Sequence, residues 1–130
     1  TKFNIYDQVV FKGWVSGKEK HKLFSEASIF CLPSYAEGFP MAVLDAWAYG
    51  IPVISTPVGG IPDIAIHGEN MLLCDPGNIV SLRDNLKLLI DDENLKIKLI
   101  KASESFANGN FSMDHLSEKW SDLYRDILNE

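Results

Sequence analysis

The run over residues 34–54 constrains the fold of this 130-residue chain more than any other segment. An apolar stretch at 29–32 ends just before it, Pro40 marks a first helical turn, and Gly50 closes that helix. A β-branched stretch, Val53–Ser55, follows at once. A helix between two short apolar strands is typical of domains in which the strands run parallel. This segment therefore predicts an α/β fold.

Apolar runs and helical patterns alternate along the rest of the chain. The apolar runs lack strict alternation, as expected of parallel strands buried on both faces. We expect strands at Val9–Phe11, Ile29–Leu32, Val53–Ser55 and Met71–Cys74. We expect helices at residues 16–27, 40–50, 60–66, 78–90, 93–106 and 112–128. This order predicts a doubly wound, Rossmann-like three-layer domain with a mostly parallel sheet.

Polar residues mark the expected helix ends. Ser16, either Asn78 or Ser81, and Ser112 are candidate N-caps, because their side chains can accept hydrogen bonds from free amides. The run Asn108-Gly109-Asn110 is expected to break the helical pattern. The apolar stripe of the last helix is expected to be core, with part of it exposed if a neighbouring domain normally covers it.

Charge and hydropathy exclude several classes of function. The formal net charge is −6, so the chain lacks the basic footprint of a nucleic-acid-binding domain. The densest basic patch of the chain contains Lys18, Lys20 and Lys22, and we interpret it as a solvated helix face. No apolar run approaches the length of a membrane span, and no signal peptide is recognisable. We therefore expect a cytoplasmic protein without a nucleic-acid partner.

Cysteine and histidine usage predicts neither a cross-link nor a metal site. Cys31 and Cys74 each lie in an apolar run, so we expect buried free thiols in a reducing compartment. The histidines are too scattered to propose a metal centre: His21, His67 and His115. Apolar residues make up 46% of the chain, enough for a core of its own.

Two carboxylates flank the start of the helix at residues 40–50. Glu37 precedes the helix, and Asp45 lies inside it. Free N–H groups and the helix dipole at such a start favour a phosphate. Carboxylates accept hydrogen bonds from sugar and ribose hydroxyls. The segment therefore predicts a site for a polyol that carries a phosphate.

The run over residues 34–54 resembles the donor-site motif of the family 4 glycosyltransferases, which are retaining enzymes that use nucleotide sugars. The resemblance extends from about Val9 to Tyr124 and rests on an ordered series of matches rather than on any one of them. The matching segments are Leu32-Pro33-Ser34, Glu37-Gly38-Phe39-Pro40, Asp45, Gly50-Ile51-Pro52-Val53, Gly59-Gly60-Ile61-Pro62-Asp63 and Asp75-Pro76-Gly77-Asn78.

The resemblance implies roles for the residues around the helix start. Glu37 would be the catalytic acid that contacts the transferred sugar, and Asp45, where the family usually has Glu, would bind the ribose. The turn and first helical residues would border the donor: Gly38, Phe39, Pro40, Met41, Ala42 and Val43. The backbone N–H groups of Met41, Ala42 and Val43 would face the diphosphate and sugar. Pro40 itself has no N–H to donate.

Three further positions are implied in donor binding. Val15, in a segment similar to the family's Phe-x-Gly-x-Val, and Ser16 would lie near the base. Thr56, at the end of an expected strand, would border the sugar pocket.

Each assignment has a plainer alternative. Glu37 could merely favour the helix dipole, and Asp45 could be a solvated acid on the helix. Val15 and Ser16 could be a plain strand end and a helix cap, and the Gly59-Gly60 pair could serve the turn geometry alone.

In the family, two Rossmann-like domains face each other across a cleft, and the second holds the nucleotide sugar. By resemblance, residues 1–130 are part of that C-terminal donor-binding domain. The chain begins at Thr1 without an initiator Met, and the family's Gly-Arg loop and Lys do not precede Val9. We expect the acceptor-binding N-terminal domain to be missing from this piece, and any peripheral membrane association to involve only that missing part.

The implied reaction moves a hexose from a nucleoside-diphosphate sugar to an acceptor hydroxyl with retention, in cell-surface polysaccharide or glycolipid synthesis. The donor is a substrate, and no cofactor or metal is implied. One alternative is a non-catalytic nucleotide-sugar-binding or assembly module completed by another chain. A second is a sugar-nucleotide epimerase of similar architecture, against which the spacing of Glu37 and Asp45 argues.

Overall fold

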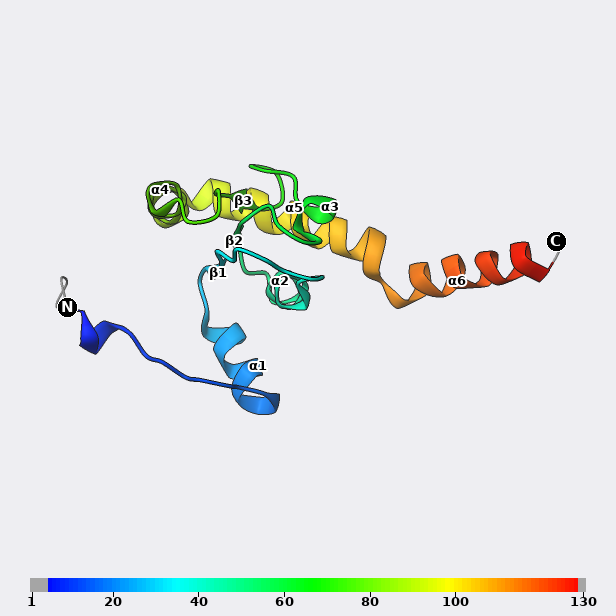
Figure 1. Ribbon diagram of the computed structural model, residues 1–130, viewed down its shortest axis with the longest axis horizontal. Coiled ribbons are helices and arrows are strands. Elements are labelled where there is room, and N and C mark those ends of the chain that lie inside the picture. The colour runs from blue at the N-terminus through cyan, green and yellow to red at the C-terminus, as the bar shows by residue number, and fades with distance from the viewer. Residues whose placement is uncertain (1–4, 129–130) are drawn as a thin grey trace.

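The computed structural model describes residues 5–128 and confirms the α/β class (Figure 1). One three-stranded parallel sheet has the order β1 (Phe30–Leu32), β2 (Val53–Ser55) and β3 (Leu72–Leu73). The helical segments of the described chain are η1 (Tyr6–Gln8), α1 (Gly17–Glu26), α2 (Met41–Ala48), α3 (Ile61–Ile64), α4 (Ile79–Asp91), α5 (Glu93–Phe111) and α6 (Met113–Leu128).

The sheet confirms three of the predicted strands. In the β1–β2 register Phe30 lies opposite Val53, and in the β2–β3 register Ile54 lies opposite Leu72. The Cys74 N–H donates to the Ser55 carbonyl at 2.9 Å, so pairing continues one residue beyond β3. The carboxyl ends of all three strands consequently meet at one edge of the sheet.

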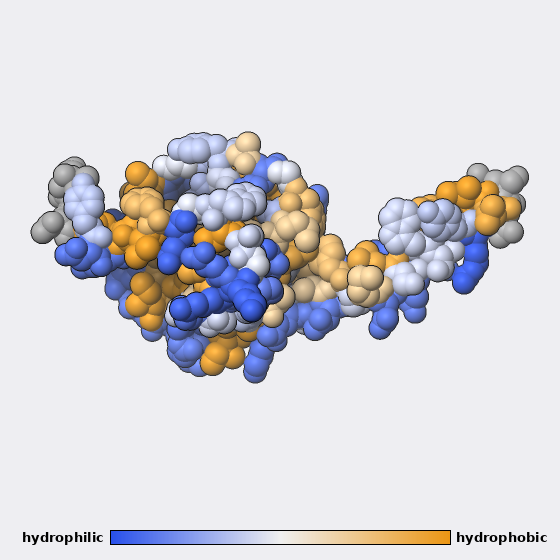
Figure 2. Space-filling view, turned by 90° about the horizontal axis from the view of Figure 1, so that it is seen from below, coloured by the Kyte–Doolittle hydropathy of each residue, from blue (hydrophilic) through white to orange (hydrophobic). Residues whose placement is uncertain are grey.

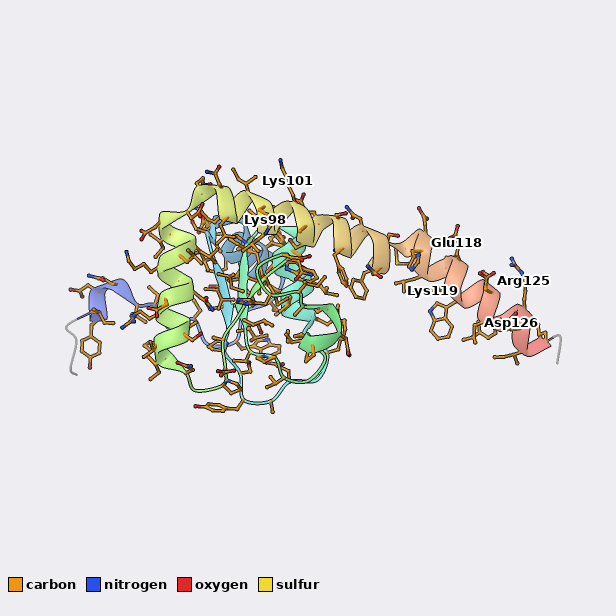
Figure 3. All side chains as sticks on the ribbon, turned by 90° about the horizontal axis from the view of Figure 1, so that it is seen from above. Lys98, Lys101, Glu118, Lys119, Arg125 and Asp126 are labelled. Atoms are coloured by element: carbon orange, nitrogen blue, oxygen red, sulfur yellow. The ribbon has the colours of Figure 1, made fainter. Side chains whose placement is uncertain are left out.

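Two apolar clusters cover the two faces of the sheet. Figure 3 shows α4 on one side of the strands, α2 and α3 on the other, and α5 running across both. The cluster on the α2 side contains Val43, Ala46, Trp47, Ile51, Val53, Ile61, Ile64 and Met71. The cluster on the α4 side contains Ile54, Leu72, Cys74, Leu89 and Leu99. Since neighbouring strand residues point to opposite faces, β2 is buried on both sides, as predicted.

Helix α2 ends as the sequence predicts. Gly50 adopts φ +64° and its N–H donates to the Trp47 carbonyl at 2.9 Å. The Ile51 N–H donates to the Ala46 carbonyl, also at 2.9 Å, which completes a Schellman motif. This closure turns the chain directly into β2 and buries Ala46 and Trp47 beneath the sheet.

The predicted strand at Val9–Phe11 is wrong. The segment is extended at Val9 (φ −122°, ψ 126°), yet it pairs with no strand within residues 5–128, and Phe11 is 91% exposed. Figure 1 shows it running away from the sheet. β-Propensity alone does not make a strand, because the backbone N–H and C=O groups need a neighbouring strand to pair with.

The predicted break at Asn108-Gly109-Asn110 is also wrong, because α5 continues through it to Phe111. The Asn110 side-chain amide donates to the Phe106 carbonyl at 2.8 Å. Phe106 packs edge-on against Trp47, and Phe111 against Phe39. These aromatic contacts outweigh the helix-weakening tendency of one glycine, which is only about 1 kcal/mol.

Two predicted caps are confirmed and one is not. Asn78 accepts from the Ser81 N–H at 3.0 Å at the start of α4, and Ser112 accepts from the His115 N–H at 3.3 Å at the start of α6. Ser16 stands at the N-cap position of α1 but makes no side-chain capping bond there.

Helix α6 projects from the body (Figure 1), and apolar side chains are exposed along it (Figure 2). Trp120 is 57% exposed and Leu128 83%. Four of the charged residues labelled in Figure 3 lie along the same projecting helix, namely Glu118, Lys119, Arg125 and Asp126, whereas Lys98 and Lys101 lie on α5. Within the described chain, none of the helices combines the length and the apolar character needed to cross a bilayer.

Candidate functional site

The loop that follows β1 holds Glu37 through a relay of side-chain hydrogen bonds. The Ser34 hydroxyl donates to Glu37 Oε1 at 2.5 Å. The Thr56 hydroxyl, from the loop after β2, donates to the Ser34 carbonyl at 2.6 Å. Thr56 is fully buried, so its hydroxyl fixes this loop from below, and no part of the residue is open to a ligand in this structure. Glu37 is thereby held at the carboxyl edge of the sheet.

A close backbone approach locks the same loop from the other side. The Gly60 N–H donates to the Gly38 carbonyl at 2.8 Å. A Cβ added at Gly59, which has φ +58°, would lie 2.2 Å from the Glu37 carbonyl oxygen. The glycine pair therefore does more than turn the chain: it lets the loop after β2 lie directly against the Glu37 backbone.

The start of α2 leaves fewer free amides than predicted. The Met41 N–H donates to the Phe39 carbonyl and the Val43 N–H to the Pro40 carbonyl, both at 2.9 Å. Across residues 5–128, the bonds outside regular helices and strands include none from the Ala42 N–H. Of the three amides expected to face a phosphate, Ala42 therefore remains the best-placed donor.

The apolar residues of this turn differ in their surroundings. Phe39 is 47% exposed and its ring packs against Phe111, with the ring centroids 6.0 Å apart. Met41 is exposed, whereas Pro40 is buried. Met41 and one side of Phe39 are thus open to a ligand, while Pro40 belongs to the packing of the turn.

Asp45 faces helix α1 and forms an ion pair there. The Lys20 ammonium donates to Asp45 Oδ2 at 2.5 Å, and both side chains are partly exposed. The sequence pattern placed Lys20 on a solvated face and missed this contact. The sequence carries no local signal for this contact, because the contact depends on how α1 packs on α2.

Helix α1 packs beside α2 through aromatic residues. Phe24 stacks on Phe30 and on Tyr49, with ring centroids 5.6 and 5.5 Å apart. The His21 Nδ1 is also hydrogen-bonded to the Tyr49 hydroxyl. Val15, which is half-buried, and Ser16 lead directly into α1, so the predicted base-side residues lie about one helical turn before Lys20.

Neither thiol is suited to act as a nucleophile. Cys31 and Cys74 are free, as predicted. Burial and the neighbouring Cys74 raise the pKa of Cys31 to about 11. Burial and the adjacent Asp75 raise the pKa of Cys74 as well.

Within residues 5–128, no group of three or more His, Cys, Asp or Glu side chains is placed to hold a metal ion.

Solved structures share this architecture. A sucrose-phosphate synthase from Thermosynechococcus elongatus superposes with a TM-score of 0.84 at 26% identity, over 98% of this chain and 32% of that one. HepE from Anabaena, solved in complex with UDP and glucose, superposes with a TM-score of 0.83 over 94% of this chain and 33% of that one. The identity to HepE is 20%, so that likeness concerns the fold alone.

Sequence comparison leads to the same group of proteins. The N-acetyl-alpha-D-glucosaminyl L-malate synthase of Bacillus anthracis is 28% identical over 127 residues, which cover 98% of this chain and 33% of that protein. The chain thus spans about a third of the length of this relative. The family model for glycosyl transferases group 1 matches residues 1–106, well over half of the chain. This chain therefore belongs to the glycosyl transferases group 1 family.

Proposed function

We propose that residues 1–130 are part of the C-terminal, donor-binding domain of a retaining glycosyltransferase, which transfers a hexose from a nucleoside-diphosphate sugar to an acceptor hydroxyl. The observation that carries the proposal is the placement of Glu37. Its carboxylate is held by Ser34 at the carboxyl edge of the sheet, beside the start of α2. Open parallel sheets bind ligands at this edge.

Glu37 is proposed to act on the donor sugar. Ser34 engages Oε1, which leaves lone pairs on the carboxylate to accept hydrogen bonds from sugar hydroxyls. A charged acceptor that is already oriented stabilises the transition state without reorganising during the reaction. In this arrangement Glu37 orients the sugar and stabilises the positive charge that develops as the bond to the diphosphate breaks.

The remaining residues are proposed to hold the nucleotide. The Ala42 N–H and the dipole of α2 face the diphosphate, and Asp45 accepts from the ribose. Val15 and Ser16 lie near the base. Binding of UDP and glucose by HepE supports a nucleotide-sugar donor and makes uridine the first base to test. We place the product in cell-surface polysaccharide or glycolipid synthesis.

The first experiment measures nucleotide binding by calorimetry of the full-length protein with UDP, GDP and ADP. Binding of one diphosphate, and its transfer reaction followed by NMR at the anomeric carbon, would support the proposal. Inversion at that carbon would refute the retaining mechanism. Absence of binding to all three nucleotides would refute the donor site.

The 130-residue chain alone is expected to be inactive. The relative from Bacillus anthracis is about three times as long as this chain. Orientation of an acceptor by a second domain would lower the activation barrier by several kcal/mol, on the order expected for positioning two reactants. Sugar transfer by the isolated chain, to any acceptor, would contradict this expectation.

A further inference from the structure

We propose that Lys20 is a positioning residue that holds Asp45 in the orientation required by the ribose of the nucleotide. The inference rests on the proposed function of the Asp45 site, and it adds a residue from within helix α1 to that site. Its starting observation is the contact of 2.5 Å between Lys20 Nζ and Asp45 Oδ2, which joins residues 25 apart in the sequence.

The Lys20–Asp45 pair differs from the other ion pairs of residues 5–128. Those pairs lie within a single helix or, in the case of Lys12 and Glu19, join a helix to the segment just before it. Lys20 and Asp45 instead link two helices, and their side chains are 43% and 35% exposed. A pair that is partly withdrawn from water is screened less than one on an open surface.

A second contact helps to position the Lys20 side chain. Its ammonium lies 5.7 Å from the centre of the Phe24 ring. That ring is stacked between Phe30 of β1 and Tyr49 at the end of α2. The ammonium therefore contacts an aromatic cluster that joins α1 to the sheet and to the end of α2.

The geometry suits an acid that is shorter than the Glu usual in the family. Lys20 occupies Oδ2, and Oδ1 retains its lone pairs for a hydroxyl of the ribose. A carboxylate held in one rotamer loses less side-chain entropy when a ligand binds. The predicted base-side residues Val15 and Ser16 lie just before α1, so Lys20 also couples the position of that helix to the ribose acid.

The test is a double-mutant cycle in the full-length protein, with affinity measured by calorimetry for the diphosphate that the wild type binds. K20M removes the cation but keeps the stem, and K20R restores a cation. K22M is the matched control, because Lys22 lies on the same helix and, within residues 5–128, its ammonium forms an ion pair only with Glu26, at 3.8 Å. Each variant is measured alone and in a D45N background. The 2′,3′-dideoxy form of the same nucleotide reports binding without the ribose hydroxyls.

We expect K20M to weaken binding about fivefold and K20R to recover most of the loss, while K22M leaves affinity unchanged. In the D45N background, K20M should have no further effect. With the dideoxy nucleotide, K20M should bind as the wild type does. These three results together identify Lys20 as acting through Asp45 on the ribose.

Other outcomes overturn the inference. An equal loss for K20M in the presence and absence of Asp45, or a loss that persists with the dideoxy nucleotide, would make Lys20 a direct contact to phosphate or base. Unchanged affinity in K20M would reduce the pair to an ordinary surface contact. If the wild type binds no nucleotide, the proposed function itself fails; if it binds and the cycle shows no coupling, only the role of Lys20 fails.

Discussion

Glu37 lies in a loop clamped by buried groups, whereas Asp45 lies on a helix and is held by one half-exposed lysine. The Glu37 loop is fixed by the buried Thr56 hydroxyl and lies so close to Gly59 that an added Cβ there would meet the Glu37 carbonyl. The Asp45 carboxylate depends on an ion pair that water can reach, and such pairs contribute at most about 1 kcal/mol.

This difference indicates which half of the site can move without disturbing the core. A loop held by buried hydrogen bonds and a backbone approach moves only if the core around it moves. A carboxylate held by one half-exposed ion pair can be reoriented at a lower cost than a loop held by buried groups. Rigidity is thus concentrated where the proposed chemistry occurs, and adaptability where the proposed ribose contact lies.

The largest expected effect separates the two acids by kinetics. In the full-length enzyme, Glu37→Ala should lower kcat about a hundredfold or more, because it removes a contact made to the reacting sugar. Asp45→Ala should mainly raise KM, by about tenfold, because it removes ground-state binding. Steady-state kinetics with Glu69→Ala, an exposed loop acid, as control distinguishes them. A larger loss of kcat in Asp45→Ala would reverse the roles.

The second prediction tests the backbone clamp. Gly59→Ala should lower the free energy of unfolding by about 2–4 kcal/mol, since its Cβ meets the Glu37 carbonyl and its φ is positive. Gly68→Ala is the matched control, because Gly68 also has positive φ but no heavy atom within 4 Å of an added Cβ. That variant should lose about 1 kcal/mol. Equal losses in urea unfolding would mean that the close approach contributes nothing.

The third prediction concerns the buried hydroxyl beneath the loop. Thr56→Val keeps the shape but leaves the Ser34 carbonyl without its donor, so stability should fall by about 1–2 kcal/mol. Ser25→Ala removes an exposed side-chain bond to the Lys22 carbonyl and should cost far less. Chemical unfolding of the two variants measures the contrast. A neutral Thr56→Val would show that the loop holds its shape without this bond.

The smallest effect uses the thiol of β1 as a reporter on the strand that leads into the Glu37 loop. Because the pKa of Cys31 is raised to about 11, the thiolate is scarce at pH 8 and alkylation by iodoacetamide should be slow until the protein unfolds. Mass spectrometry of labelled protein measures the rate. Rapid labelling of Cys31 in the native state would show that β1 opens readily.

The same raised pKa has a consequence for stability. A thiol that binds its proton more tightly in the folded state contributes stability that is fully present below its unfolded pKa, near 9. That contribution is lost as the pH rises through about 11. Stability measured from pH 8 to 11 should therefore fall in the wild type and fall less in Cys31→Ala.

The sequence by itself determined the elements that depend on neighbouring residues. The β-branched run of β2, the glycine closure of α2 and the caps at Asn78 and Ser112 are encoded within a few positions, because helix ends and strand periodicity are local properties. The same local patterns placed Glu37 between a strand and a helix.

Tertiary structure decided the features that depend on distant partners. Residues 9–11 have the composition of a strand but no neighbouring strand to pair with in the described chain, and α5 passes through Gly109 because aromatic packing with α2 outweighs a weak local signal. Lys20 resembles its neighbours on α1 in the sequence, and only the packing of α1 on α2 brings it to Asp45. A sequence pattern indicates which face of a helix or strand a residue occupies. The residue that it contacts on a neighbouring element is set by how the elements pack.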